Sequence, residues 1–108
     1  MGREMPEQIH TWLKGSRYVK SVRGRHTREY RAYRDMLNRC YREKHNRYHR
    51  YGGRGISVCP EWLGDGGFDA FVDSMGICPE NMSLDRVDND EDYRPSNCRW
   101  ATRSEQAL

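Results

Sequence analysis

The stretch SLDRVDNDEDYRPSNCRW, residues 83–100, opens on a short alternating segment, passes through a run of acidic residues and ends on arginine and tryptophan. Residues 83–87 alternate with period two, so that Asp85 and Arg86 point to opposite faces of a predicted strand. A second strand-like segment covers residues 98–101. The stretch therefore predicts a two-stranded ribbon whose strands are joined by a long polar loop over residues 88–96.

A helix signal follows the ribbon directly. Thr102 and Glu105 form a capping box, in which each side chain satisfies a backbone N–H at the start of a helix. The order of elements predicted here is strand, loop, strand and helix, with the helix beginning at Arg103.

An amphipathic helix is predicted upstream of the ribbon, after the N-cap residue Thr27. Apolar side chains recur there at helical spacing, and arginines fall on the opposite face. The apolar positions are Tyr30, Tyr33, Met36, Leu37, Cys40 and Tyr41, and the arginines are Arg28, Arg31, Arg39 and Arg42. We therefore expect a helix that buries one face and presents an arginine ridge on the other.

The remaining signals are shorter. Residues 56–58 indicate a short strand, and residues 68–75 indicate a second helix that Gly76 stops. Near the N-terminus, residues 6–14 indicate a short helix, and the glycines and arginines after it indicate an extended arm. We expect an α+β protein with a basic N-terminal arm over residues 1–26 and a folded domain over residues 27–108.

Charge is divided unevenly between the two halves of the 108-residue chain. Residues 1–54 hold 15 Lys and Arg against 5 Asp and Glu, whereas residues 55–108 hold 4 against 11. Most of the cations are arginine, whose planar guanidinium binds phosphate through two hydrogen bonds. The basic half predicts a polyanionic partner, and a solvated charged face with internal ion pairs is the alternative.

The four cysteines, Cys40, Cys59, Cys78 and Cys98, occur singly. No C-x-x-C pair is present, so buried free thiols are expected, and a structural Zn²⁺ site built from three or four of them is the less favoured alternative. No run approaches the roughly 18 apolar residues of a membrane span, and the N-terminus lacks the order of a signal peptide. An intracellular protein without membrane contact is expected.

The acidic run first suggests a calcium loop, because Asp88, Asp90 and Asp92 reproduce the D-x-D-x-D opening of an EF-hand. That interpretation fails further along the loop. Tyr93 occupies the position of the obligatory glycine, and Arg99 occupies that of the bidentate glutamate.

The blocks RDMLNRCY, YGGRGISVC and SLDRVDNDEDYRPSNCRWATRSEQ together resemble the small HNH endonucleases of bacteriophages and prophages. The resemblance covers roughly residues 28–106. It implies a ββα-metal fold, Mg²⁺ or Mn²⁺ as cofactor, and hydrolysis of phosphodiester bonds in double-stranded DNA. It also implies the cytoplasm, which is the host's if a phage encodes the chain. A homodimer would make a double-strand cut easiest.

The resemblance assigns roles to individual residues. It places Asp85 and Gln106 as metal ligands and Asn97 as the residue that ties the loop together. Arg86 stands where the family has its general-base histidine, and an arginine cannot accept a proton from water because its pKa stays above about 12. Arg86 would instead stabilise the charge that grows on the phosphate, or simply pair with Asp88 or Asp90.

The general base must then come from elsewhere. Tyr93 in the loop is the first choice, although it could equally be a packing residue, and His45, His49 or a metal-bound hydroxide are the alternatives. The residues expected to contact DNA are Arg28, Arg31, Arg39, Arg42, Arg50 and Arg54. The competing functions are a phage DNA-binding or inhibitory protein that keeps the scaffold without cleavage, and a zinc-stabilised module that binds no nucleic acid.

Overall fold

A computed structural model describes residues 16–107 of the chain. The expected helix over residues 6–14 lies outside the described residues. The elements are, in order, β1 (Ser21–Val22), β2 (Arg25–His26), α2 (Arg28–Tyr41), the 3₁₀ turns η1 (Tyr48–Arg50), η2 (Gly52–Arg54) and η3 (Pro60–Trp62), α3 (Gly67–Met75), β3 (Ser83–Arg86), η4 (Pro95–Asn97), β4 (Cys98–Ala101) and α4 (Arg103–Gln106). The α+β class is confirmed.

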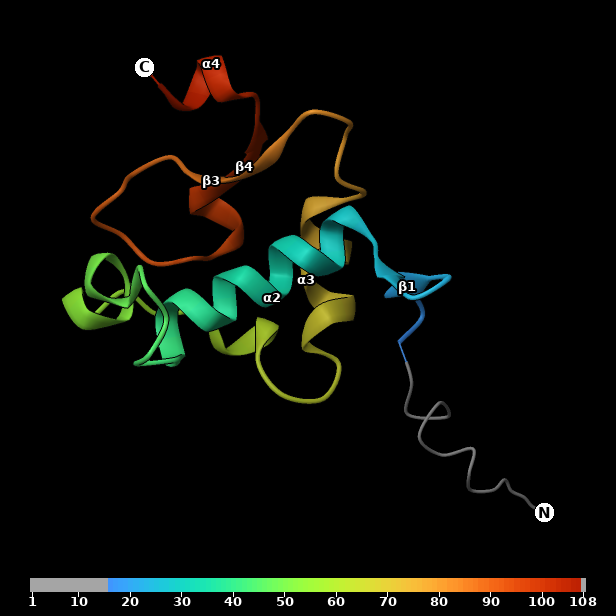
Figure 1. Ribbon diagram of the computed structural model, residues 1–108, viewed down its shortest axis with the longest axis horizontal. Coiled ribbons are helices and arrows are strands. Elements are labelled where there is room, and N and C mark those ends of the chain that lie inside the picture. The colour runs from blue at the N-terminus through green and yellow to red at the C-terminus, as the bar shows by residue number, and fades with distance from the viewer. Residues whose placement is uncertain (1–15, 108) are drawn as a thin grey trace.

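Helix α2 forms where the periodicity predicts it. The Thr27 hydroxyl accepts a hydrogen bond from the Tyr30 N–H, and the helix ends at Tyr41, where Arg42 turns to extended backbone. In Figure 1, α2 runs across the middle of the molecule, with the β1–β2 hairpin at its N-terminal end and the β3–β4 ribbon above it.

The core is built from aromatic side chains between α2 and α3. Tyr33 on α2 tilts against Phe71 on α3 with ring centroids 5.4 Å apart, and its hydroxyl donates to the Trp62 carbonyl at 2.7 Å. Trp62 and Phe71 meet edge to face at 5.0 Å, and both are fully buried. These contacts fix α3 against α2, and Gly76, with φ of 74°, ends α3.

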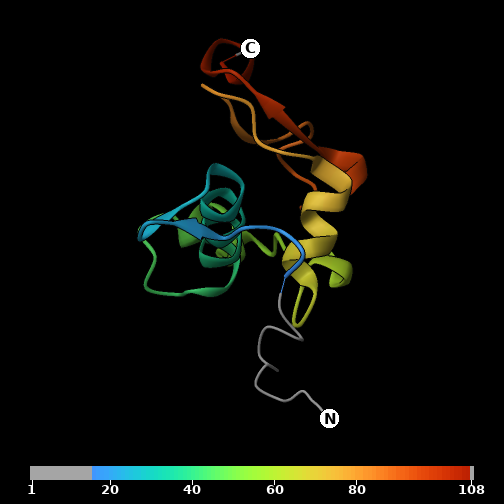
Figure 2. The ribbon, with the colours of Figure 1, turned by 90° about the vertical axis from the view of Figure 1, so that its right-hand side faces the viewer.

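The ribbon packs on the other side of α3. Strands β3 and β4 are antiparallel, with Asp85 opposite Arg99 and Arg86 opposite Cys98. Trp100 on β4 donates its indole N–H to the Met75 carbonyl at 2.7 Å. Figure 2 shows the ribbon and α2 on different sides of α3, so α3 sets the separation between them.

The strand expected over residues 56–58 is wrong. Val58 forms only an isolated parallel bridge with Tyr93, held by the Tyr93 N–H to Ser57 and the Cys59 N–H to Tyr93, both at 2.9 Å. Together with the ion pair between Arg54 and Asp90, this bridge joins residues 54–59 to the loop between the ribbon strands. Among residues 16–107, no helix is long and apolar enough to cross a membrane.

Candidate functional site

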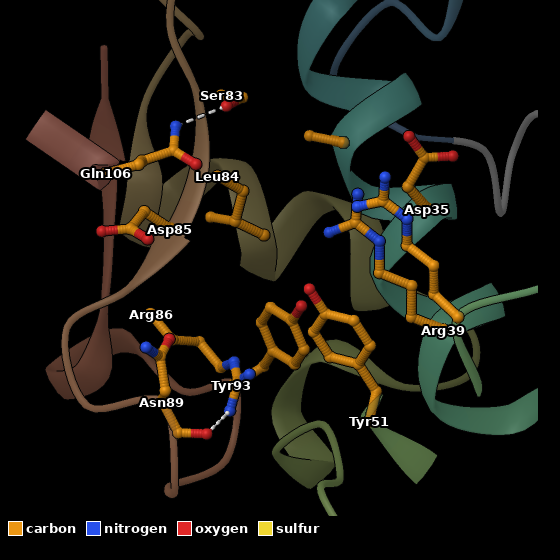
Figure 3. A pocket seen from close by; sticks show the side chains of 12 residues that line it. Asp35, Arg39, Tyr51, Ser83, Leu84, Asp85, Arg86, Asn89, Tyr93 and Gln106 are labelled. Atoms are coloured by element: carbon orange, nitrogen blue, oxygen red, sulfur yellow. Dashed lines mark hydrogen bonds between the residues drawn. The ribbon is translucent and has the colours of Figure 1, made fainter. Parts of the chain in front are cut away.

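A polar cleft opens between α2 and β3. Helix α2 contributes Ala32, Asp35 and Arg39 to its lining, β3 contributes residues 83–86, and Gln106 of α4 borders one end. Figure 3 shows Asp85 and Gln106 on the ribbon side, with Asp35 and Arg39 facing them from α2. The cleft thus brings together side chains from segments that lie far apart in the sequence.

A second hollow adjoins the cleft and adds to its positive charge. Arg39, Arg47, Ser83 and Gln106 line both, and the second also contains Arg103. Three arginines from α2, the following turn and α4 therefore surround the end of the cleft where Gln106 lies. Guanidinium groups arranged in this way suit the oxygens of a phosphate.

Asp85, which the resemblance assigns as a metal ligand, lines the cleft. Its Oδ2 accepts a hydrogen bond from the Arg99 Nε at 3.0 Å, because the strand register places Arg99 directly opposite. The Asp85 side chain is 18% exposed, so the carboxylate reaches the cleft while it stays paired on the ribbon.

Gln106 reaches the cleft through the capping box that starts α4. The Thr102 N–H donates to Glu105 at 2.8 Å and the Glu105 N–H returns to the Thr102 hydroxyl at 3.2 Å. The Gln106 amide nitrogen donates to the Ser83 hydroxyl at 2.7 Å and to the Ala101 carbonyl at 3.0 Å. These bonds use both amide hydrogens, so Oε1 is the Gln106 atom left to coordinate a cation or to accept a hydrogen bond.

Arg86 is buried and held from several sides. Its Nη1 donates to the main-chain carbonyls of Asn89 at 2.6 Å and Glu91 at 2.8 Å. The guanidinium carbon lies 5.1 Å from the ring centroids of both Tyr51 and Tyr93. The expected pairing with Asp88 or Asp90 is wrong, because Arg86 bonds to backbone carbonyls and Asp90 pairs with Arg54 at 2.7 Å.

Tyr93 also lines the cleft, but its surroundings oppose the role of a base. Burial raises the pKa of Tyr93 to about 12, and the neighbouring Arg39 guanidinium only partly counters this effect. A phenol that keeps its proton to that pH cannot take one from water near neutrality. The ring stacks on Tyr51 with centroids 6.2 Å apart, which is the packing role left open by the sequence.

Asn97 ties the loop together, as the resemblance implies. Its Oδ1 accepts the Asp88 N–H at 2.8 Å, and its Nδ2 donates to the carbonyls of Asp88 at 3.1 Å and Asp92 at 3.0 Å. The side chain is buried and lies beneath the loop. Asn97 therefore acts on the cleft indirectly, by holding the loop that carries Tyr93.

The other acidic residues of the loop are occupied in holding it. Asp88 accepts the Asp90 N–H at 2.9 Å, Asp92 accepts the Ser57 N–H at 2.8 Å, and Glu91 pairs with Arg94 at 3.4 Å. Together with the pair between Asp90 and Arg54, these contacts show that most acidic side chains of residues 88–92 bind groups within the loop or elsewhere in the protein.

The six arginines expected to contact DNA divide into three groups. Arg31, Arg42 and Arg50 are exposed, as a DNA-contacting surface requires. Arg39 is half-buried and points into the cleft, with its guanidinium 5.3 Å from the Tyr51 ring.

Two further predicted arginines are engaged with the protein. Arg28 donates to the Cys78 carbonyl at 3.0 Å, and Arg54 bonds to Asp90 and to the Asn89 carbonyl. The alternative bases His45 and His49 are absent from the cleft lining that the described residues form. Sequence reasoning missed Asp35, because a single acid among arginines gives no signal of its own.

All four cysteines are free thiols, two of them buried. Burial raises the pKa of Cys40 and of Cys98 to about 11, so both remain protonated at neutral pH. Within residues 16–107, no three His, Cys, Asp or Glu side chains gather closely enough to share a metal ion.

Comparison with known proteins gives no relative from which a role could be transferred. No family model, curated protein or solved structure matches the chain.

Proposed function

We propose that the protein binds double-stranded DNA in the cleft between α2 and β3 and hydrolyses a phosphodiester bond there, as a metal-dependent endonuclease of the HNH type. The observation that carries the proposal is the meeting of Asp85, Gln106 and Arg39 in one cleft. The first two are the ligands that the resemblance assigns, and Arg39 supplies positive charge for the phosphate.

The order of elements supports the same proposal. Strands β3 and β4 pair antiparallel and α4 follows within one residue, which is the arrangement expected of a ββα-metal domain. The loop between the strands returns to the cleft through Tyr93 rather than extending into solvent. A cleft bordered in this way has room for a phosphate between the ribbon and Arg39 of α2.

The donor set fits a hard divalent cation that keeps part of its hydration. Mg²⁺ is commonly bound by one or two carboxylates together with substrate phosphates and water, and here Asp85 and the Gln106 Oε1 would supply the protein oxygens. The cation, when bound, would stabilise negative charge on the phosphate and lower the pKa of a bound water. With so few protein ligands, it should bind far better in the presence of DNA.

The chain's own groups then have separate tasks. Arg39, Arg47 and Arg103 bind and orient the phosphate, and Arg86 holds the loop against Tyr51. Because Arg86 and Tyr93 cannot accept a proton near neutral pH, Asp35, the second carboxylate in the cleft lining, takes that role in the proposal.

A second candidate is a DNA-binding protein that does not cut. The immobilised Arg86 favours it, since the position of the family's histidine is occupied by a side chain that holds the loop. The Asp85 carboxylate, already paired with Arg99, favours it as well.

Nicking of supercoiled plasmid separates the two. Wild-type protein is incubated with Mg²⁺, Mn²⁺, Co²⁺ or Ni²⁺, and with EDTA as the blank, while binding to a duplex is measured in parallel. We expect metal-dependent nicking, its loss in Asp85→Asn, and duplex binding in that variant equal to wild type or slightly tighter. Asp65→Asn, an exposed loop position away from the cleft, is the matched charge control.

The other results of this experiment each argue against the nuclease proposal in a different way. Wild-type binding without nicking in any metal would favour the non-cutting protein. Nicking that survives in Asp85→Asn would place the chemistry outside the cleft. Failure of the wild type to bind duplex would overturn both candidates.

A further inference from the structure

The β1–β2 hairpin is the smaller of the two sheets within residues 16–107, and none of its side chains is buried in the core. Ser21 pairs with His26 and Val22 with Arg25, and Arg23 and Gly24 form the turn with φ of 52° and 80°. Two left-handed residues in succession are typical of a type I′ turn, which prefers Asn-Gly. Arg23 at the first of these positions departs from that preference, so the turn geometry does not explain why an arginine is found there.

The hairpin is exposed and strongly basic. All residues from 21 to 26 are exposed, and Val22 is 57% exposed. The segment from residue 16 to residue 28 contains five Lys or Arg and no Asp or Glu. Such a surface suits a polyanion, and an exposed valine beside it can contact a deoxyribose or a thymine methyl group.

The base of the hairpin is fixed to the rest of the protein. The Thr27 N–H donates to the Lys20 carbonyl at 2.9 Å, and the Arg17 side chain pairs with Asp73 on α3 at 2.6 Å. The backbone N–H of Arg17 also donates to Asp69 at 2.9 Å. The tip therefore projects from an anchored base, as Figure 1 shows.

Helix α2 sets the spacing between the hairpin and the cleft. The hairpin ends at the N-cap Thr27 and Arg39 lines the cleft, so the rise of an α-helix places them about 18 Å apart along its axis. The exposed Arg31 lies between them on the same helix face. At about 3.4 Å per base pair, this length corresponds to about five base pairs of duplex DNA.

We infer that the β1–β2 hairpin is a second DNA-contacting element, which binds duplex DNA about five base pairs or more from the phosphate held in the cleft, with Arg23 reaching a groove or its bordering phosphates. The inference rests on the proposed function. We take duplex DNA as the ligand of the hairpin, because a rigid polyanion can contact the hairpin and the cleft at the same time when both lie along one straight helix.

The test replaces the arginine without weakening the turn. Arg23→Asn creates the Asn-Gly pair that a type I′ turn prefers, so the hairpin should remain folded while it loses the guanidinium. Lys44→Ala, at an exposed position beyond the end of α2, is the charge-matched control. Arg23→Lys keeps the charge and tests whether a phosphate contact suffices.

Binding is measured on a 25-base-pair duplex over a range of salt, together with hydroxyl-radical footprinting. For Arg23→Asn we expect about tenfold weaker binding at low salt and a salt slope smaller by about 0.9, as for one lost phosphate contact. Protection should disappear about five base pairs or more to one side of the centre of the footprint. Lys44→Ala should leave that flank protected, and Arg23→Lys should restore the slope.

The possible failures are distinguishable. If wild type binds duplex and Arg23→Asn matches it in slope and footprint, the inference is overturned and the proposed function stands. A loss in Arg23→Asn confined to single-stranded DNA, RNA or an acidic protein would also overturn it. If wild type does not bind duplex at all, the proposed function and the inference fail together.

Discussion

The carboxamide of Asn97 pairs with the backbone of Asp88 in both directions, accepting its N–H at 2.8 Å and donating to its carbonyl at 3.1 Å. A second carbonyl, that of Asp92, accepts from the same Nδ2. One side chain thus satisfies backbone groups at both ends of the acidic loop, where no strand partner is present to do so.

Asn97→Ala should therefore destabilise the protein by about 3 kcal/mol, because it leaves part-buried backbone groups without partners. Urea unfolding at pH 7 measures the change. Asn89→Ala is the matched control, since Asn89 bonds through its main-chain carbonyl, and it should lie within about 0.5 kcal/mol of wild type. Equal losses in the two variants would contradict this account of the loop.

Arg86 should matter for stability more than for chemistry. Arg86→Lys keeps the charge but loses the planar group that lies against the rings of Tyr51 and Tyr93, so we expect a loss of about 2 kcal/mol in the free energy of unfolding. Arg86→His should destabilise at least as much, without increasing plasmid nicking. An inert wild type that gains nicking on Arg86→His would show instead a nuclease disarmed at this position.

The raised pKa of Tyr93 predicts that the protein becomes less stable at alkaline pH. The phenol ionises near pH 10 in the unfolded chain and near 12 in the folded protein, so the unfolded chain binds fewer protons between these values. The free energy of unfolding should therefore fall with rising pH in this window, by about 1 kcal/mol at pH 11. Tyr93→Phe should lack this component. Unfolding curves at pH 8 and pH 11 that shift equally in both proteins would contradict the prediction.

The arginines of α2 should bind DNA through phosphates. Wild-type affinity should fall with salt by about 0.9 power for each phosphate contact. Arg31→Ala combined with Arg39→Ala should weaken binding to unrelated duplex sequences alike, since phosphate contacts carry no base identity. Arg39→Ala alone should also reduce nicking. Fluorescence anisotropy with two duplexes of different sequence tests this, and a sequence-selective loss would point to base contacts.

Gly52 is predicted to tolerate no side chain. A Cβ there would lie 2.1 Å from the Cys40 carbonyl oxygen and 2.4 Å from the Tyr48 ring. Because the first contact is with backbone, no rotamer change relieves it, and Gly52→Ala should cost about 3 kcal/mol or more. Gly53→Ala, whose nearest contact would be 3.2 Å, is the control and should cost clearly less. Thermal unfolding compares the two.

The sequence predicted most of the elements because their signals are local. Helix α2 has a clear apolar period and an N-cap, β3 alternates, and the capping box at Thr102 marks α4. The β1–β2 hairpin was expected only as part of a basic arm, because its strands have two residues each and no apolar alternation.

The candidate site was predictable in part. Asp85 and Gln106 line one cleft and Asn97 holds the loop, and the metal-binding role that the resemblance assigns to the first two stays a prediction. The surroundings of Arg86 and Tyr93 were not predictable, because both depend on Tyr51, a residue of the basic half with no sequence signal for this contact. The position of Arg39 in the cleft was not predictable, because helical spacing alone does not show which side of α2 the ribbon covers.

The bridge between Val58 and Tyr93, with the Ser57 to Asp92 bond beside it, closes a loop of 35 residues. Helix α2 and the β3–β4 ribbon can each begin to form from local contacts, but the cleft exists only after this long-range closure, whose entropic cost delays it. Until then Arg54 lacks its partner Asp90, and the basic half stays open. During folding, a nucleic acid would therefore encounter an unfolded, positively charged segment before the cleft has formed. It would compete with the acidic loop for the same arginines.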